Sequence, residues 1–264
     1  MARNSLQSVM KLINDVTTEQ PIEKQFLQEL KRSIEMTDEK YRSKPTASYK
    51  PSGMNCTRSM YYQVSGTEPD KSDSGYCLIG ICESGTDRHV RIQNAVADMK
   101  NNGFDCEYVD VAEFVRSREL NYLDIIEKSG NETKLFHKHL NMRFLCDGII
   151  RYKGKYIIVE FKTESIYKWQ NRQGVNPDHY NQAIAYSVAL GLDDVMFIYI
   201  NRDNTDMKSY MFHVTDDMKQ DFVGRIDYVD NYVKQMKVPP KPTDVPRKSC
   251  EYCNYKSSCR KDGD

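Results

Sequence analysis

The segment 142–163 holds two β-rich runs, FLCDGIIRY and KYIIVEFKT, which meet at Lys153 and Gly154. Apolar and β-branched residues on both sides of a two-residue turn predict a β-hairpin. With those two residues as the turn, Asp147 stands directly opposite Glu160, and their β-carbons lie about 4.5 to 5.5 Å apart. A three-residue turn would shift the register and separate the two carboxylates.

The predicted hairpin places acidic groups among apolar ones. Its runs also carry Ile149, Ile150, Ile157, Ile158, Val159 and Phe161. Such runs are typical of strands covered on both faces, where unpaired charge is costly. A divalent cation with oxygen ligands between Asp147 and Glu160 meets this need, and Lys162 projects from the same face as Glu160. The alternative is a half-exposed ribbon whose carboxylates and lysine face solvent.

Three further side chains fall where they can join the hairpin. Apolar residues at helical spacing predict a helix over 85–100, with His89 on its inward side. A second helix, predicted over 176–191 from its Asn-Pro start and closing glycine, carries Gln182 and Tyr186 four residues apart on one face. The alternative for the histidine is an ordinary, hydrogen-bonded core residue, and the Gln/Tyr pair alone indicates little.

Taken in order, these residues resemble the PD-(D/E)XK nuclease superfamily, and within it the RecB-like exonucleases. That family has a helical G-x-x-x-H, then an Asp, an E-x-K and a Q-x-x-x-Y. This chain shows Gly85-x-x-x-His89, Asp147, Glu160-Phe161-Lys162 and Gln182-x-x-x-Tyr186. The resemblance covers roughly residues 54–260. It implies an α/β fold with a restriction-endonuclease-like core, a central mixed β-sheet flanked by helices, and an iron–sulfur-clamped helical cap.

The resemblance also implies roles for these residues. The metal ligands would be His89, Asp147, Glu160 and the Phe161 carbonyl, and the metal Mn²⁺ or Mg²⁺. Catalysis would depend on Lys162 together with Asp147 and Glu160, while Gln182 and Tyr186 would position the strand or the metal. Family members hydrolyse DNA phosphodiesters and leave a 5′-phosphate.

The chain has eight cysteines, and some of them are candidate ligands of a second metal centre. Three lie in a C-x2-C-x5-C run, at Cys250, Cys253 and Cys259. Spacing alone leaves Cys56, Cys77 and Cys82 open as the fourth ligand; the resemblance implies Cys56, through Cys56-Thr57-Arg58 and the tyrosines that follow. Four thiolates fit zinc or a [4Fe–4S] cluster. The resemblance, here to AddB-type nucleases and CRISPR-associated RecB-like exonucleases, implies the cluster.

Charge and hydropathy bear on partners and location. Lys+Arg and Asp+Glu are balanced at 38 each, so bulk charge favours neither nucleic acid nor membrane as a partner. Residues 237–260, however, hold six basic against two acidic side chains. Candidate DNA contacts are Arg58, Tyr61, Tyr62, Lys248 and Lys256. The N-terminus lacks the apolar run of a signal peptide and no stretch is long enough to span a bilayer, so we expect a cytoplasmic protein.

The remaining segments complete the predicted organisation. We expect a helical appendage of two helices over 1–45 and a nuclease domain over 46–264 with cluster ligands from both ends. Between its motifs the nuclease domain should contain a strand at 106–111, a helix through 126, a strand from 133, a second hairpin at 195–201 and 207–214, and a long helix capped by Thr215.

The functional prediction is a metal-dependent DNA nuclease, an exonuclease on single-stranded DNA ends. It would act in repair, recombination, phage replication or CRISPR adaptation, beside a helicase, recombination or adaptation partner. One rival is a nucleic-acid-binding protein that has lost catalysis and keeps a structural metal cluster. The other is a zinc-stabilised restriction-type endonuclease, which would cut closed circles.

Overall fold

In the computed structural model the described residues are 21–42, 44–70, 75–245 and 247–263, and the side chains of 247 and 248 stand outside this set. The chain divides into two compact units, one of Met1–Ser43 with Asp73–Ile81 and one of Lys44–Ser72 with Cys82–Asp264. The first unit thus takes in a segment that lies beyond the predicted 1–45 appendage. The first of the two helices predicted there falls in residues outside the described set.

The described part of the first unit pairs helix α2 (Ile22–Tyr41) with the start of α4 (Tyr76–Ala97). Within it, the Glu35 carboxylate accepts a hydrogen bond of 3.0 Å from the Tyr76 amide. The Lys31 ammonium lies 4.6 Å from the centre of the Tyr76 ring. No residue of α2 is buried against other described residues.

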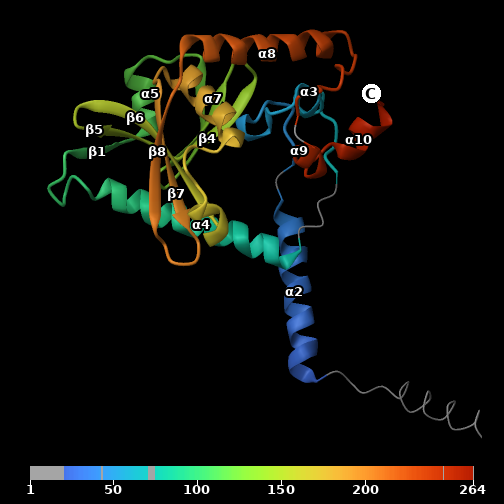
Figure 1. Ribbon diagram of the computed structural model, residues 1–264, viewed down its shortest axis with the longest axis horizontal. Coiled ribbons are helices and arrows are strands. Elements are labelled where there is room, and N and C mark those ends of the chain that lie inside the picture. Colours follow the sequence, from blue (N-terminus) through green and yellow to red (C-terminus); the bar gives the residue numbers. More distant parts are fainter. Residues whose placement is uncertain (1–20, 43, 71–74, 246, 264) are drawn as a thin grey trace, which may run out of the picture. The chain divides into compact units, whose positions relative to one another are not determined.

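The second unit is built on a five-stranded sheet in the order β1-β5-β6-β7-β8. Its strands are β1 (Cys106–Val109), β5 (Gly148–Tyr152), β6 (Lys155–Glu164), β7 (Asp194–Asn201) and β8 (Met207–His213). The β6–β7 pair is parallel and the other pairs are antiparallel, so the sheet is mixed. The parallel crossover runs through α6 (Ile166–Gln170), η2 (Pro177–His179) and α7 (Tyr180–Leu190). Figure 1 labels the five strands and α7.

The β5–β6 hairpin has the predicted two-residue turn. Lys153 and Gly154 both adopt positive φ, 49° and 79°, as the turn that matches the twist of paired strands requires. Gly148 pairs with Val159, so one further step along the same register sets Asp147 opposite Glu160. The predicted register is confirmed.

The β-rich run that precedes the turn is divided between two sheets. β4 (Met142–Cys146) joins β2 (Leu123–Ser129) and β3 (Glu132–His137) in a separate three-stranded sheet, and β5 begins after Asp147. The helix predicted through 126 is wrong: α5 (Val111–Ser117) ends early and β2 follows. Leu123 and Ile125 project to the same face of the three-stranded sheet, where Leu123 is buried in the core and Ile125 packs partly buried against it.

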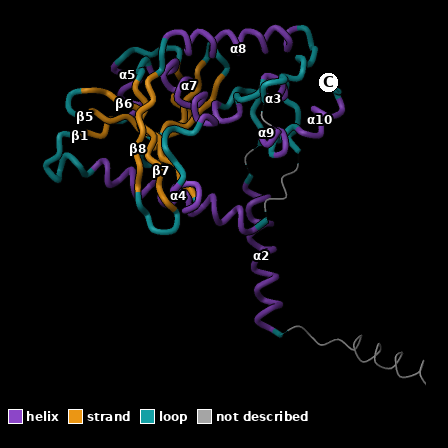
Figure 2. The backbone as a smooth tube through the Cα atoms, viewed as in Figure 1, coloured by secondary structure: helices purple, strands orange, loops and turns teal. Residues whose placement is uncertain are grey.

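Helices cover both faces of the five-stranded sheet (Figure 2). On one face α4 contributes Ile92 to a cluster with Ile157 and Phe161, and on the other α7 packs with α8 (Asp216–Lys234). Thr215 caps α8 by accepting from the Met218 amide, as predicted. The α/β class and the mixed sheet flanked by helices are confirmed, and the arrangement is consistent with a restriction-endonuclease-like core.

Short helices complete the second unit: η1 (Pro51–Gly53), α3 (Thr57–Val64), α9 (Arg247–Glu251) and α10 (Lys256–Lys261). α8 contacts α3, and α3 lies near α9 and α10 in Figure 1. Every described helix is too short or too polar to cross a bilayer. The helix predicted over 85–100 begins earlier, at Tyr76, because no residue at 84–86 interrupts it.

Candidate active site

Asp147 occupies the junction between the two sheets and is held there from three sides. Its Oδ2 accepts a hydrogen bond of 2.8 Å from the Phe161 amide on β6. Its carbonyl accepts from Gln93 Nε2 of α4 at 3.2 Å and from the Tyr108 hydroxyl of β1 at 2.9 Å. The residue is only 5% exposed. Its carboxylate therefore has a fixed position in a largely dry environment.

Glu160 is buried beside it, with 3% exposure. Its Oε1 accepts from Lys162 Nζ and from Gln182 Nε2, both at 2.6 Å. Its Oε2 is buried and has no hydrogen-bond partner among the described residues. A buried, unpartnered carboxylate oxygen is costly in a folded protein, and a bound cation would supply the missing partner.

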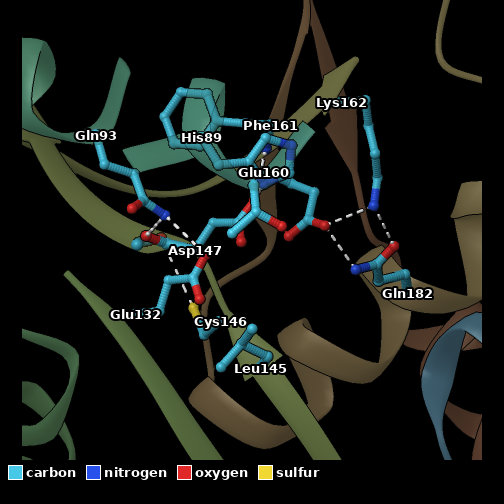
Figure 3. Close-up of polar contacts among 12 residues, drawn as sticks. His89, Gln93, Glu132, Leu145, Cys146, Asp147, Glu160, Phe161, Lys162 and Gln182 are labelled. Atoms are coloured by element: carbon cyan, nitrogen blue, oxygen red, sulfur yellow. Dashed lines mark hydrogen bonds and ion pairs between the residues drawn. The ribbon is translucent and has the colours of Figure 1, made fainter. Parts of the chain in front are cut away.

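A group of possible metal ligands surrounds this position. Single ligand atoms of His89, Glu132 and Asp147 lie within 4.8 Å of one another, with His89 Nδ1 3.9 Å from Asp147 Oδ2. Figure 3 shows the three side chains gathered in one region with Glu160. Nitrogen and carboxylate oxygens of this kind suit a divalent cation such as Mn²⁺ or Mg²⁺.

Glu132 is a candidate ligand that sequence reasoning missed. On the three-stranded sheet Thr133 pairs with Cys146, so one more step along that register sets Glu132 beside Asp147. Gln93 Nε2 lies 3.5 Å from Glu132 Oε1. The position of Glu132 follows from the pairing of β3 with β4, and the sequence pattern did not predict that pairing.

The electrostatics of the site show an excess of buried negative charge. Burial, and then the nearby Glu160 carboxylate, raise the pKa of Asp147 well above its usual value. Burial likewise raises the pKa of Glu132, and Glu160 adds to the effect. Burial and the Lys162 ammonium lower the pKa of His89 to about 4. The imidazole is therefore neutral near pH 7 and free to act as a metal ligand.

Lys162, Gln182 and Tyr186 form one hydrogen-bonded chain. Lys162 Nζ donates to Gln182 Oε1 at 2.9 Å, and Gln182 Nε2 donates to the Tyr186 hydroxyl at 2.6 Å. The Tyr186 hydroxyl donates in turn to the Leu145 carbonyl of β4 at 2.7 Å. The structure thus brings these predicted residues together. Tyr186 is 1% exposed, and its hydroxyl holds the Gln182 amide in place.

Phe161 contributes its amide, which holds Asp147, and its side chain packs in the α4 face of the sheet. Its carbonyl as a metal ligand stays a prediction.

The cysteine centre is less compact than the acidic one. Burial raises the pKa of Cys56 at the start of α3, and the nearby thiols of Cys253 and Cys259 raise it further. Cys250 lies one turn before Cys253, whose amide donates to its carbonyl. Among the described residues no three cysteine sulfurs lie within 4.8 Å of one another. Neither the [4Fe–4S] prediction nor the zinc alternative gains support from this arrangement.

Arg58 is 3% exposed and ties α3 to the end of the described chain. Its Nε donates to the Pro239 carbonyl at 3.0 Å, and its Nη1 donates to the Gly263 carbonyl and lies 3.6 Å from Cys259 Sγ. These bonds occupy the guanidinium within the protein.

The other predicted DNA contacts differ in exposure. The buried Tyr62 donates to Asp262 Oδ2 at 2.6 Å, and Tyr61 packs half-buried against the core. Lys256 Nζ lies 3.5 Å from the Glu251 carbonyl. The Lys248 side chain is outside the described residues.

Comparison with known proteins yields structural likeness alone. No family model matches the chain, and no curated protein matches it. The crystal structure of SSO0001 shares 14% identity over 90% of this chain and 97% of that one, with a TM-score of 0.47. An alkaline exonuclease of Laribacter hongkongensis, LHK-Exo, shares 10% identity over 73% of this chain and 90% of that one, with a TM-score of 0.38.

LHK-Exo in complex with dAMP gives a TM-score of 0.42 at 10% identity, over 75% of this chain and 93% of that one. At these values no residue or activity is carried over to this chain.

Proposed function

We propose that this protein is a metal-dependent DNA nuclease of the PD-(D/E)XK, RecB-like kind. The observation that carries the proposal is the buried, unpartnered Oε2 of Glu160 next to a second buried carboxylate, Asp147, with a lysine two residues further along the strand. A purely structural role would leave that oxygen without a partner and two buried carboxylates facing one ammonium, that of Lys162.

His89, Glu132, Asp147 and Glu160 would hold the cation, with the Phe161 carbonyl as a further ligand. A bound divalent ion supplies Lewis-acid polarisation of a phosphate oxygen and a lowered pKa for its water. The neutral His89 imidazole makes Mn²⁺ at least as suitable as Mg²⁺.

Lys162 would stabilise the charge that develops on the phosphoryl oxygens. Its ammonium uses two donors on Glu160 and Gln182, which leaves the third for the substrate. Gln182 fixes the direction of the ammonium, and Tyr186 fixes Gln182. A positioned, partly desolvated cation of this kind acts most strongly on a transition state that carries extra negative charge.

The substrate proposed is single-stranded DNA with free ends, in keeping with the RecB-like resemblance. Closed circular DNA separates this proposal from a restriction-type endonuclease: an exonuclease leaves closed circles intact and degrades the same DNA once it is linear.

Replacement of Lys162 by alanine tests the proposal. With Mn²⁺ and end-labelled single-stranded DNA, Lys162→Ala should lower hydrolysis by about a hundredfold or more, while circular dichroism and DNA binding are retained. Lys155→Ala, an exposed lysine at the other end of the same strand, is the matched control and should cleave like the wild type. Equal activity in all three proteins would remove Lys162 from the mechanism.

For the cysteines we propose a structural iron–sulfur centre held by Cys56, Cys250, Cys253 and Cys259. The proposal is supported by the family resemblance and by the nearness of Cys56 to Cys253 and to Cys259, each of which raises the pKa of the Cys56 thiol. Anaerobic purification tests it: iron with acid-labile sulfide supports the cluster, and stoichiometric zinc without iron rejects it.

A further inference from the structure

His179 lies next to the proposed active site on an element that the mechanism above does not use. It ends η2 and precedes Gln182 by three residues, so the two side chains project from the same side of the chain as it enters α7. Its ring stacks on Phe197 and Tyr199, with centroid distances of 5.8 Å to each.

The two aromatic rings place His179 beside Glu160 and Lys162 of β6. Phe197 is the register partner of Glu160, and Tyr199 is the register partner of Lys162. Register partners on neighbouring strands project to the same face of a sheet. His179 therefore covers the same face that carries Glu160 and Lys162. Consistent with this, Lys162 is the charged group with the strongest effect on the His179 imidazole.

The hydrogen bonds around Tyr199 define the tautomer of His179. The Asn176 amide donates to the Tyr199 hydroxyl oxygen at 3.0 Å, and His179 Nδ1 lies 3.0 Å from that same oxygen. The phenol proton has no other acceptor among the described residues, so it donates to Nδ1. Nδ1 is then the acceptor, and the proton of a neutral ring sits on Nε2.

The charge state agrees with this assignment. Burial, then Lys162, lower the pKa of His179 to about 3, and burial raises the pKa of Tyr199 to about 12. The imidazole and the phenol are both neutral near pH 7. No described residue accepts a hydrogen bond from His179 Nε2, so that donor is left for a ligand.

We propose that His179 is a substrate-binding residue. Its Nε2–H donates to an oxygen of a DNA phosphate, and that phosphate neighbours the phosphate that Lys162 contacts on the same strand. This inference rests on the proposed nuclease function. The surrounding cations favour an anionic partner: Lys162 and Lys168 act on the ring, whereas the charge of Arg172 is already paired with the buried Glu164. A neutral donor adds a directed bond without a further charge to desolvate.

Three substitutions distinguish the roles of the two ring nitrogens of His179. His179→Gln keeps an N–H donor near the Nε2 position, His179→Asn keeps a partner for Tyr199 near Nδ1, and His179→Phe keeps the stacked ring alone. With Mn²⁺ and single-stranded DNA, we expect kcat/KM to fall about tenfold in His179→Phe and His179→Asn, the loss of one hydrogen bond, and to fall no more than about threefold in His179→Gln.

A structural role would reverse this order, because His179→Asn would then restore the Tyr199 contact and activity. That reversed order, or wild-type kcat/KM in all three variants, would overturn the proposal. Thermal unfolding of each variant shows whether a loss of activity reflects loss of fold.

A second measurement does not depend on cleavage. In long-range ¹H–¹⁵N spectra of the wild type, with His179→Phe to assign the signals, we expect an unprotonated Nδ1 and a protonated Nε2. A short single-stranded oligonucleotide, added with Ca²⁺, should shift Nε2. A protonated Nδ1, or an Nε2 signal that the oligonucleotide leaves unchanged, rejects the proposal. If the wild type hydrolyses no DNA, the nuclease function fails, and this arm still decides whether His179 binds phosphate.

Discussion

The Phe161 amide donates to Asp147 Oδ2 across 2.8 Å, and so it joins the junction of the two sheets to the strand that carries Glu160. An asparagine at 147 can still accept this bond, but it removes the charge. Asp147→Asn thus separates the structural part of the aspartate from its part in metal binding.

We expect Asp147→Asn to stabilise the metal-free protein near neutral pH and to abolish stabilisation by Mn²⁺. The pKa of Asp147 is raised in the folded state, so the contribution of this group to stability is complete below its unfolded pKa and is lost as the pH rises through the folded pKa. Thermal unfolding with and without Mn²⁺ measures both effects. An Mn²⁺-induced gain equal to that of the wild type would contradict the assignment.

Glu132→Gln should weaken Mn²⁺ binding by at least about tenfold, because even partners one shell beyond the ligands contribute that much. Titration calorimetry on metal-free protein measures the affinity. Glu127→Gln on the neighbouring strand is the control: its side chain is 64% exposed, and its affinity for Mn²⁺ should match that of the wild type. Equal affinities in both variants would exclude Glu132 as a ligand.

Gly148 gives room to the tyrosine that supports the site. A Cβ at 148 would lie 2.7 Å from the Tyr108 hydroxyl, which donates to the Asp147 carbonyl. Gly148→Ala should therefore lower the free energy of unfolding by about 1 to 3 kcal/mol and reduce cleavage. Gly224 in α8 has no described atom within 4 Å of such a Cβ, so Gly224→Ala should raise stability by up to about 1 kcal/mol. Urea unfolding compares the two.

His137 makes the fold sensitive to acid. Burial, then His139, lower its pKa to about 4, and its Nδ1 accepts from the Leu140 amide. A lowered histidine pKa means that, as the pH falls, the unfolded chain binds the proton before the folded chain does. The contribution of His137 to the free energy of unfolding is therefore complete above about pH 6.5 and is lost as the pH falls toward 4. At pH 5 this group should lower the free energy of unfolding by about 2 kcal/mol.

His137→Asn keeps an acceptor for the Leu140 amide and removes the titrating ring. Between pH 7 and pH 5 the free energy of unfolding of the variant should fall by about 2 kcal/mol less than that of the wild type. Urea unfolding at each pH measures the difference. Parallel losses in the two proteins would show that His137 is not the group responsible.

The hairpin was predictable because its determinants are local. Lys153 and Gly154 fix the turn, and the turn fixes the register that sets Asp147 against Glu160. Glu132 was not predictable in this way, because its place depends on the pairing of β3 with β4 in a stretch whose strand β2 was taken for a helix. Pairing between strands is set by tertiary packing more than by intrinsic preference.

Arg58 shows a second limit of sequence patterns. A basic residue followed by two tyrosines suggests contact with nucleic acid, yet its donors meet carbonyls of residues 239 and 263. Backbone acceptors are available in every sequence, so no pattern of residue types announces which of them a guanidinium will find.

The link between Tyr62 and Asp262 spans 200 positions, and that separation has a consequence for synthesis. A ribosome delivers α3 long before it delivers the partners that α3 needs. This corner of the molecule can close only after the segment around residue 262 has emerged from the ribosome, so α3 must wait for some 200 further residues before it finds this partner.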